Sequence, residues 1–182
     1  MKLVYQFIYN PIVNFILRRI CKILLPITGF RLPPSGIIRI NLTGGRSFRM
    51  ATNQTSYVTK KLYYEGTQAF EYSPIFETLV TKCRTFLDIG ANTGYYSLLA
   101  ATSGPTKTYA FEPSPGPLHY LKLNVDLNNF SQQIEIIDVA LSDRKGTITF
   151  YSPVNSKYNL LANLGGIGSL IPNQKKTQFS RG

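Results

Sequence analysis

Residues Phe86 to Ser97 constrain the fold of this chain more than any other stretch. They read Phe-Leu-Asp-Ile-Gly-Ala-Asn-Thr-Gly-Tyr-Tyr-Ser. An apolar strand ends at Asp88, and Gly90 and Gly94 frame a tight turn before a predicted helix. Open α/β sheets bind nucleotide-like ligands where a strand ends at a glycine turn and leads into a helix. The stretch therefore predicts an α/β fold with a ligand site at the end of this strand.

The spacing of the turn excludes two common nucleotide loops. A dinucleotide fingerprint needs G-x-G-x-x-G, but Asn92 takes the middle glycine position and no glycine follows Gly94 at the required offset. A phosphate-binding P-loop needs a Gly-Lys-Ser/Thr ending, which this stretch lacks. The carboxylate of Asp88 also argues against a phosphate site. A strand, a turn and a helix with no ligand remain the alternative.

The stretch resembles the first motif of class I S-adenosylmethionine-dependent methyltransferases. Within that class it is most similar to the FkbM-type family, whose signature reads Asp-Ile-Gly-Ala-Asn-x-Gly. In that family the loop wraps the methionine half of S-adenosyl-L-methionine. The resemblance implies a Rossmann-like class I methyltransferase sheet, with a cofactor wall formed by Asp88, Gly90, Ala91, Asn92 and Gly94.

A second acidic candidate, Glu112, follows the next predicted strand, residues 106–111, and lies 24 residues after Asp88. Rossmann-like units place an acidic residue roughly 20 residues after the glycine turn, where it binds ribose hydroxyls. A carboxylate can accept two hydrogen bonds at once, which suits a vicinal diol. The family resemblance gives Glu112 this role. The alternative is a solvated loop carboxylate.

A helix and a third strand are expected after Glu112. Pro117 marks the start of the helix, and the apolar positions that follow recur at helical spacing. The third strand covers residues 134–139. In the family the region after this strand lies beside the adenine, so the resemblance implies that Asp138 and Ala140 belong to the adenine pocket.

The family continues where this sequence does not. Residues 147–151 predict a strand of the hairpin that follows the third strand, and residues 154–182 read as a Gly- and Lys-rich loop or tail. Family members then add a fourth strand with an acidic tip. We therefore expect a sheet truncated after the third strand and the following hairpin, with an unpaired apolar edge prone to association. The resemblance therefore implies that this chain is the N-terminal portion of a methyltransferase, and we expect it to be inactive alone.

Three elements are expected before the signature stretch. Residues 36–42 and 47–52 predict a pair of strands, and Ser73 begins a helix that runs to about Lys82. Its expected buried side consists of Ile75, Phe76, Leu79 and Val80. A chain of 182 residues is expected to form one domain. Its segments are 1–30 (basic and amphipathic), 31–72 (strand pair and lead-in), 73–153 (Rossmann-like cofactor half) and 154–182.

The net charge of +11 is unevenly distributed, because residues 1–62 hold ten Lys or Arg residues and no acid. Residues 1–27 combine apolar and basic side chains and predict two helical pieces broken near Asn10-Pro11. They are too interrupted for a spanning helix, which needs about 20 mostly apolar residues. Contact with an anionic membrane surface and packing on the domain both remain open. Nucleic-acid binding has only the charge in its favour, since no recognition motif is present.

The expected function is methyl transfer from S-adenosyl-L-methionine to a hydroxyl of a sugar or secondary metabolite, by resemblance. The catalytic residue is unknown: the single histidine, His119, lies on a predicted helix, and the two cysteines have no ligand partners at metal-site spacing. The expected location is the cytoplasm, with peripheral membrane contact through residues 1–27. The alternatives are a non-catalytic membrane-surface or partner-binding module on a degenerate Rossmann half, and a basic nucleic-acid binder.

Overall fold

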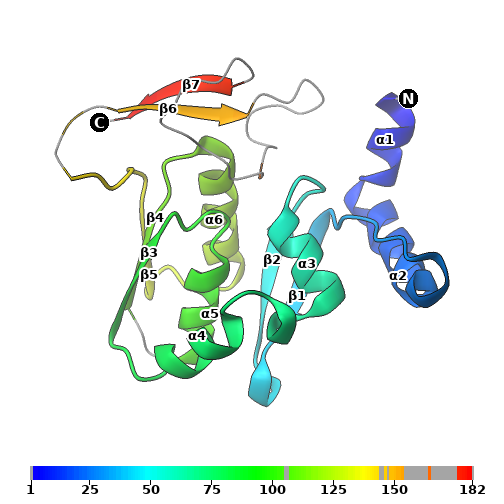
Figure 1. Cartoon of the computed structure of the whole chain (residues 1–182), viewed down its shortest axis with the longest axis horizontal. Coiled ribbons are helices and arrows are strands. Elements are labelled where there is room, and N and C mark those ends of the chain that lie inside the picture. Colours follow the sequence, from blue (N-terminus) through cyan, green and yellow to red (C-terminus); the bar gives the residue numbers. More distant parts are fainter. Residues whose placement is uncertain are drawn as a thin grey trace. The chain divides into compact units, whose positions relative to one another are not determined.

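A computed structural model describes residues 2–104, 107–143, 146, 148–153, 164 and 176–181. The chain divides into two compact units, Met1–Phe76 and Glu77–Gly182, each of which has its own internal contacts. Figure 1 shows the elements of both units.

The first unit begins with two helices, α1 (Lys2–Ile8) and α2 (Pro11–Thr28). Asn10 separates them, because its side-chain oxygen accepts hydrogen bonds from the N–H groups of Ile12 and Val13 and so caps α2. Pro11 occupies the first turn of α2, where its missing N–H costs nothing. The predicted break near Asn10-Pro11 is confirmed.

An antiparallel hairpin forms the centre of this unit. Strands β1 (Gly36–Asn41) and β2 (Ser47–Thr52) pair in a register that sets Ile38 opposite Met50 and Ile40 opposite Phe48, and all four of these side chains are buried. The 3-10 turn η1 (Thr43–Gly45) joins the strands. Both strands match the sequence prediction closely.

Two further elements of the first unit follow the hairpin. Helix α3 (Tyr57–Glu65) starts at Ser56, whose hydroxyl accepts a hydrogen bond from the N–H of Thr59, and the 3-10 turn η2 (Thr67–Ala69) comes after it. Helix α3 was not predicted from the sequence. Only Thr59 and Leu62 of this helix are buried, so its apolar periodicity is weak.

Helix α4 (Ser73–Val80) leads from the first unit into the second and corrects one expectation. Its buried residues include Ser73, Glu77 and Val80, which recur at helical spacing, whereas Ile75 and Leu79 are more than half exposed. The expected buried side was therefore wrong for these two residues. The helix turns a partly polar face inward.

The second unit contains a parallel sheet with the order β3-β4-β5. Its strands are β3 (Thr85–Ile89), β4 (Lys107–Phe111) and β5 (Ile134–Ile137). Helix α5 (Tyr95–Ser103) connects the first two strands and α6 (Pro115–Leu127) connects the last two. Both helices lie on the same side of the sheet (Figure 1), as right-handed crossovers require. The predicted α/β class with a Rossmann-like arrangement is confirmed.

The opposite face of this sheet carries apolar side chains with partial exposure. Leu87 and Ile89 of β3 are both more than half exposed, and in the described part of the chain β3 is an edge strand. Asp88 points to the helix-covered side, because successive residues of a strand face opposite ways.

A separate two-stranded sheet joins β6 (Ile148–Pro153) and β7 (Lys176–Arg181) in antiparallel pairing. Strand β6 was expected, whereas β7 lies where the sequence analysis expected a loop or tail. The partner of β6 is β7, a partner that was not predicted from the sequence.

Candidate functional site

The loop between β3 and α5 has a backbone that favours glycine at two points. Gly90 and Gly94 have φ values of +78° and +88°, and Asn92, a residue that tolerates this region, has +52°. The N–H groups of Gly90 and Ala91 both donate to the carbonyl oxygen of Phe111 at 2.9 Å. These bonds fix the start of the loop against the end of β4.

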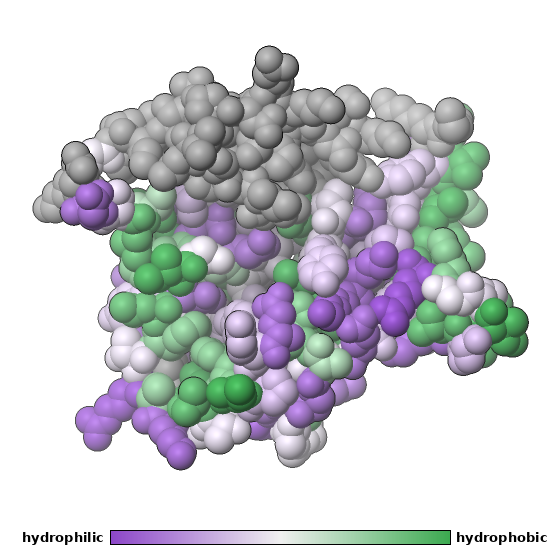
Figure 2. Space-filling view, in the orientation of Figure 1, coloured by the Kyte–Doolittle hydropathy of each residue, from purple (hydrophilic) through white to green (hydrophobic). Residues whose placement is uncertain are grey.

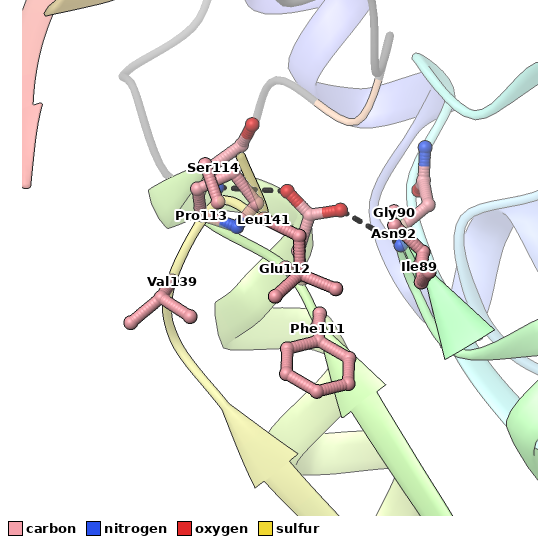
Figure 3. A pocket seen from close by; sticks show the side chains of 10 residues that line it. Ile89, Gly90, Asn92, Phe111, Glu112, Pro113, Ser114, Val139 and Leu141 are labelled. Atoms are coloured by element: carbon pink, nitrogen blue, oxygen red, sulfur yellow. Dashed lines mark hydrogen bonds between the residues drawn. The ribbon is translucent and has the colours of Figure 1, made fainter. Parts of the chain in front are cut away.

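Glu112 holds two loops with one carboxylate. Its Oε2 accepts a hydrogen bond from the N–H of Asn92 at 2.8 Å, and its Oε1 accepts one from the N–H of Ser114 at 2.7 Å (Figure 3). The residue directly follows β4 and is only 5% exposed. Each carboxylate oxygen has a second lone pair, so Glu112 can still accept a bond from a ligand.

A cavity of about 220 Å³ opens at the carboxyl ends of the three parallel strands. Its walls come from the ends of β3 and β4 and from the segment after β5; they are Ile89, Gly90, Asn92, Phe111, Glu112, Pro113, Ser114, Val139, Ala140 and Leu141 (Figure 3). Whole-ligand pockets usually measure roughly 300–1,000 Å³, so this cavity fits part of a ligand. Its position is the one at which open α/β sheets bind ligands.

The cavity brings together four of the eight residues that the sequence analysis selected. These four are Gly90, Asn92, Glu112 and Ala140. The lining does not include the other four, which are Asp88, Ala91, Gly94 and Asp138. Ala91 is buried, whereas Asp138 is exposed.

Asp88 faces inward, toward α5. Its Oδ2 accepts a hydrogen bond from the hydroxyl of Ser97 at 2.5 Å, and the residue is 8% exposed. Burial raises the pKa of Asp88, hydrogen bonds from Ser97 partly oppose the rise, and the charge of Glu112 adds to it. Burial also raises the pKa of Glu112, and its bonds from Ser114 and Asn92 oppose this. Asp88 thus holds β3 to the helix beneath the cavity.

Two residues that support the loop were missed from the sequence. Ser97 binds Asp88, and Asn124 of α6 donates its side-chain N–H to the carbonyl oxygen of Thr93 at 2.9 Å. Asn124 is fully buried. It lies three residues after Leu121 on the apolar face of the helix, and a polar residue at such a position is the signal that would have identified it.

The chemistry of the walls favours a ligand with hydroxyl groups and positive charge. Among the described residues that line the cavity, Glu112 alone is charged, and the segment after β5 supplies apolar groups from Val139, Ala140 and Leu141. A carboxylate repels phosphate and attracts a cation. A Cβ built on Gly90 would meet no protein atom within 4 Å, so the space above this glycine is open to a ligand. These features fit a ligand that presents hydroxyl groups to Glu112 and a flat apolar group to the segment after β5.

Comparisons with known proteins give partial matches. No family model matches the sequence. The AMB antimetabolite synthetase AmbE of Pseudomonas aeruginosa is 30% identical over 112 residues, which cover 60% of this chain and 5% of that protein.

Solved structures that resemble the chain include methyltransferases. A SAM-dependent methyltransferase from Agrobacterium tumefaciens is 17% identical and covers 57% of this chain and 32% of its own, with a TM-score of 0.40. The N-terminal domain of human METTL16 in complex with SAH is 21% identical. The match covers 76% of this chain and 50% of that structure, with a TM-score of 0.37. TYW2 of P. horikoshii in complex with MeSAdo is 17% identical. The match covers 75% of this chain and 53% of that structure, with a TM-score of 0.40. The chain spans about a twentieth of the curated relative and between 32% and 53% of these structures.

Proposed function

We propose that this chain binds S-adenosyl-L-methionine at the ends of β3, β4 and β5 and provides the cofactor-binding part of a methyltransferase. The observation that carries the proposal is the buried carboxylate of Glu112, fixed by two backbone N–H groups on the wall of the cavity. Two rigid bonds orient the carboxylate before a ligand arrives, so little ordering is needed on binding. The hydroxyl of Ser114 also bonds this carboxylate, and the lone pair that remains suits a ribose hydroxyl.

The rest of the loop would bind the amino-acid part of the cofactor. Gly90 and Asn92 line the cavity beside Glu112, and the open space over Gly90 allows a close approach of the backbone. The buried carboxylates of Asp88 and Glu112 together give this end of the sheet a negative potential. When bound, the cofactor supplies an activated methyl group on a positively charged sulfur.

The acceptor belongs to the same proposal: a hydroxyl group of a sugar or secondary metabolite. Its support is the resemblance of residues 86–97 to the FkbM-type motif, together with the Pseudomonas relative, whose name describes an antimetabolite synthetase. The protein would need to align the hydroxyl with the methyl group and to help remove its proton. We assign no residue to the removal of that proton; His119 is exposed on α6.

Calorimetric titration of the full chain with S-adenosylhomocysteine tests the proposal. We expect one binding site with a dissociation constant in about the micromolar range. Glu135→Gln is the matched control for substitutions at Glu112. Glu135 lies on β5 of the same sheet, but it is exposed, and its Oε2 lies 3.6 Å from Nζ of Lys107. This variant should bind like the original chain. Absence of binding heat in the original chain, at concentrations that detect millimolar affinity, would overturn the proposal.

As pH is lowered, the affinity for S-adenosylhomocysteine is expected to fall at a higher pH than it would if Glu112 had the ordinary pKa of a glutamate. The ionised form of Glu112 accepts the ribose hydrogen bond, and burial raises its pKa above the usual 4.5. Affinity for S-adenosylhomocysteine should therefore be highest near neutral pH and decline as pH falls through the raised pKa. Titrations between about pH 4 and 8 measure this decline. A midpoint at or below 4.5 would contradict the burial of the carboxylate at the site.

The unliganded chain is expected to show the opposite trend in stability. Since the folded state raises the pKa of both Asp88 and Glu112, it binds protons more tightly than the unfolded state does. Their contribution to the free energy of unfolding is complete below the ordinary pKa values and is lost as pH rises through the raised ones. Urea unfolding at a series of pH values measures this, and Asp88→Asn should flatten the dependence.

A further inference from the structure

Helix α2 points its polar residues toward the protein. Asn14 and Arg18 are 0% and 3% exposed. Asn14 donates to the carbonyl oxygen of Pro33 and accepts from the N–H of Ser35, and Arg18 donates to the carbonyl oxygens of Ser35 (3.0 Å) and Ile37 (2.8 Å). Lys22, one turn further, donates to the carbonyl oxygen of Tyr63 at 2.8 Å. A polar stripe at four-residue spacing thus fastens the helix to residues 33–37 and to α3.

The opposite side of the same helix is apolar and exposed. Ile12, Ile23 and Ile27 are each at least 75% exposed, and Ile16 and Ile20 lie between them on one stripe. Helix α1 adds the exposed side chains of Leu3, Val4 and Phe7. We call these eight residues the outer apolar face; in Figure 2 hydrophobic surface covers α1 and α2. A surface helix normally has the reverse arrangement, with its apolar stripe buried.

An exposed apolar face of this extent needs an apolar environment. The positive charge of residues 1–62 and the position of Arg19 indicate which apolar environment this is. The first acidic residue of the sequence is Glu65, and residues 1–62 hold ten Lys or Arg residues. Arg19 is exposed beside the face, with its guanidinium 3.9 Å from the centre of the Phe15 ring. A second copy docked through this face would bring two strongly cationic segments together, which disfavours a dimer.

We propose that the outer apolar face docks on the surface of an anionic phospholipid bilayer. The isoleucines of α2 and the side chains of α1 would enter the headgroup and acyl boundary, while Arg19 would meet the lipid charges and the net positive charge of residues 1–62 would attract the chain to the anionic surface. No helix in the described part of the chain is long and apolar enough to cross a membrane, so the helices would lie along the surface. The inference is independent of the proposed cofactor site.

Co-sedimentation with vesicles tests this docking. The full chain should sediment with vesicles of phosphatidylcholine containing about 30 mol% phosphatidylserine, and at least about tenfold less with phosphatidylcholine alone. Salt at about 0.5 M should weaken the binding. Ile16→Gln/Ile23→Gln should reduce binding to the anionic vesicles at least about tenfold. The matched control is Ile37→Gln, an exposed isoleucine of β1 outside the face.

A fluorescence measurement provides a second readout, because the chain contains no tryptophan. Ile23→Trp should show a blue-shifted emission on anionic vesicles, whereas Ile37→Trp should not. Equal vesicle binding by the Ile16→Gln/Ile23→Gln variant, or an unshifted Ile23→Trp spectrum on the vesicles, would overturn the proposal. A third result would also overturn the proposal: the original chain self-associates and does not bind vesicles, and the Ile16→Gln/Ile23→Gln variant no longer self-associates. The outer apolar face would then be an interface with a second copy.

Discussion

Replacing Glu112 by glutamine is expected to weaken the binding of S-adenosylhomocysteine by about 100-fold or more. A hydrogen bond to a charged group contributes about 1.5–3 kcal/mol, and the ribose loses this charged partner. Glutamine also replaces one acceptor oxygen by an NH₂ group. Because the carboxylate accepts from both the Asn92 and Ser114 N–H groups, one backbone donor must then face another donor.

The same variant should lower the free energy of unfolding by about 1–3 kcal/mol, the cost of an unsatisfied buried N–H group. Circular dichroism at the assay temperature establishes that the variant is folded before its affinity is measured by calorimetry. Glu135→Gln, which removes an exposed carboxylate from the same sheet, should change neither quantity appreciably. A folded Glu112→Gln variant that binds within threefold of the original chain would place the ribose elsewhere.

The position of Glu112 could be predicted from sequence because it depends on topology. In a parallel sheet the ends of neighbouring strands lie side by side, so an acid directly after β4 must lie near the loop after β3. The environment of Asp88 required the structure. The sequence shows that a carboxylate ends β3, but the bond to Ser97 depends on how α5 packs under the strand.

The elements that sequence reasoning missed depend on contacts between distant residues. Strand β7 exists as a partner of β6, with Phe179 opposite Phe150, and no local pattern near residue 176 reveals this pairing. Helix α2 shows the same limit in another form. Its composition predicts an amphipathic basic helix, but the hydrogen bonds of Arg18 and Lys22 to backbone carbonyl oxygens are needed to show that these two basic residues point inward.

Replacing Gly94 by alanine is expected to destabilise the second unit by about 2–5 kcal/mol. Two costs combine at this position. The φ of +88° lies in the left-handed region, which costs an ordinary residue about 1–2 kcal/mol. A Cβ on Gly94 would also lie 2.5 Å from Cδ1 of Leu121, which is fully buried in α6, and overpacking of a core typically costs about 1–3 kcal/mol. Urea unfolding measures the loss.

Two other glycines separate these costs. Gly90 has a φ of +78° and open space around its Cβ position, so Gly90→Ala should cost about 1–2 kcal/mol from backbone strain alone. Gly104, at the other end of α5, has an extended φ of 179° and no atom within 4 Å, so Gly104→Ala should leave stability unchanged or raise it by up to about 1 kcal/mol. Shortening the opposing side chain in Gly94→Ala/Leu121→Val should cost less than the sum of the two single changes. Strict additivity of that pair would show that Leu121 moves aside freely and that strain at Gly94 is the whole effect.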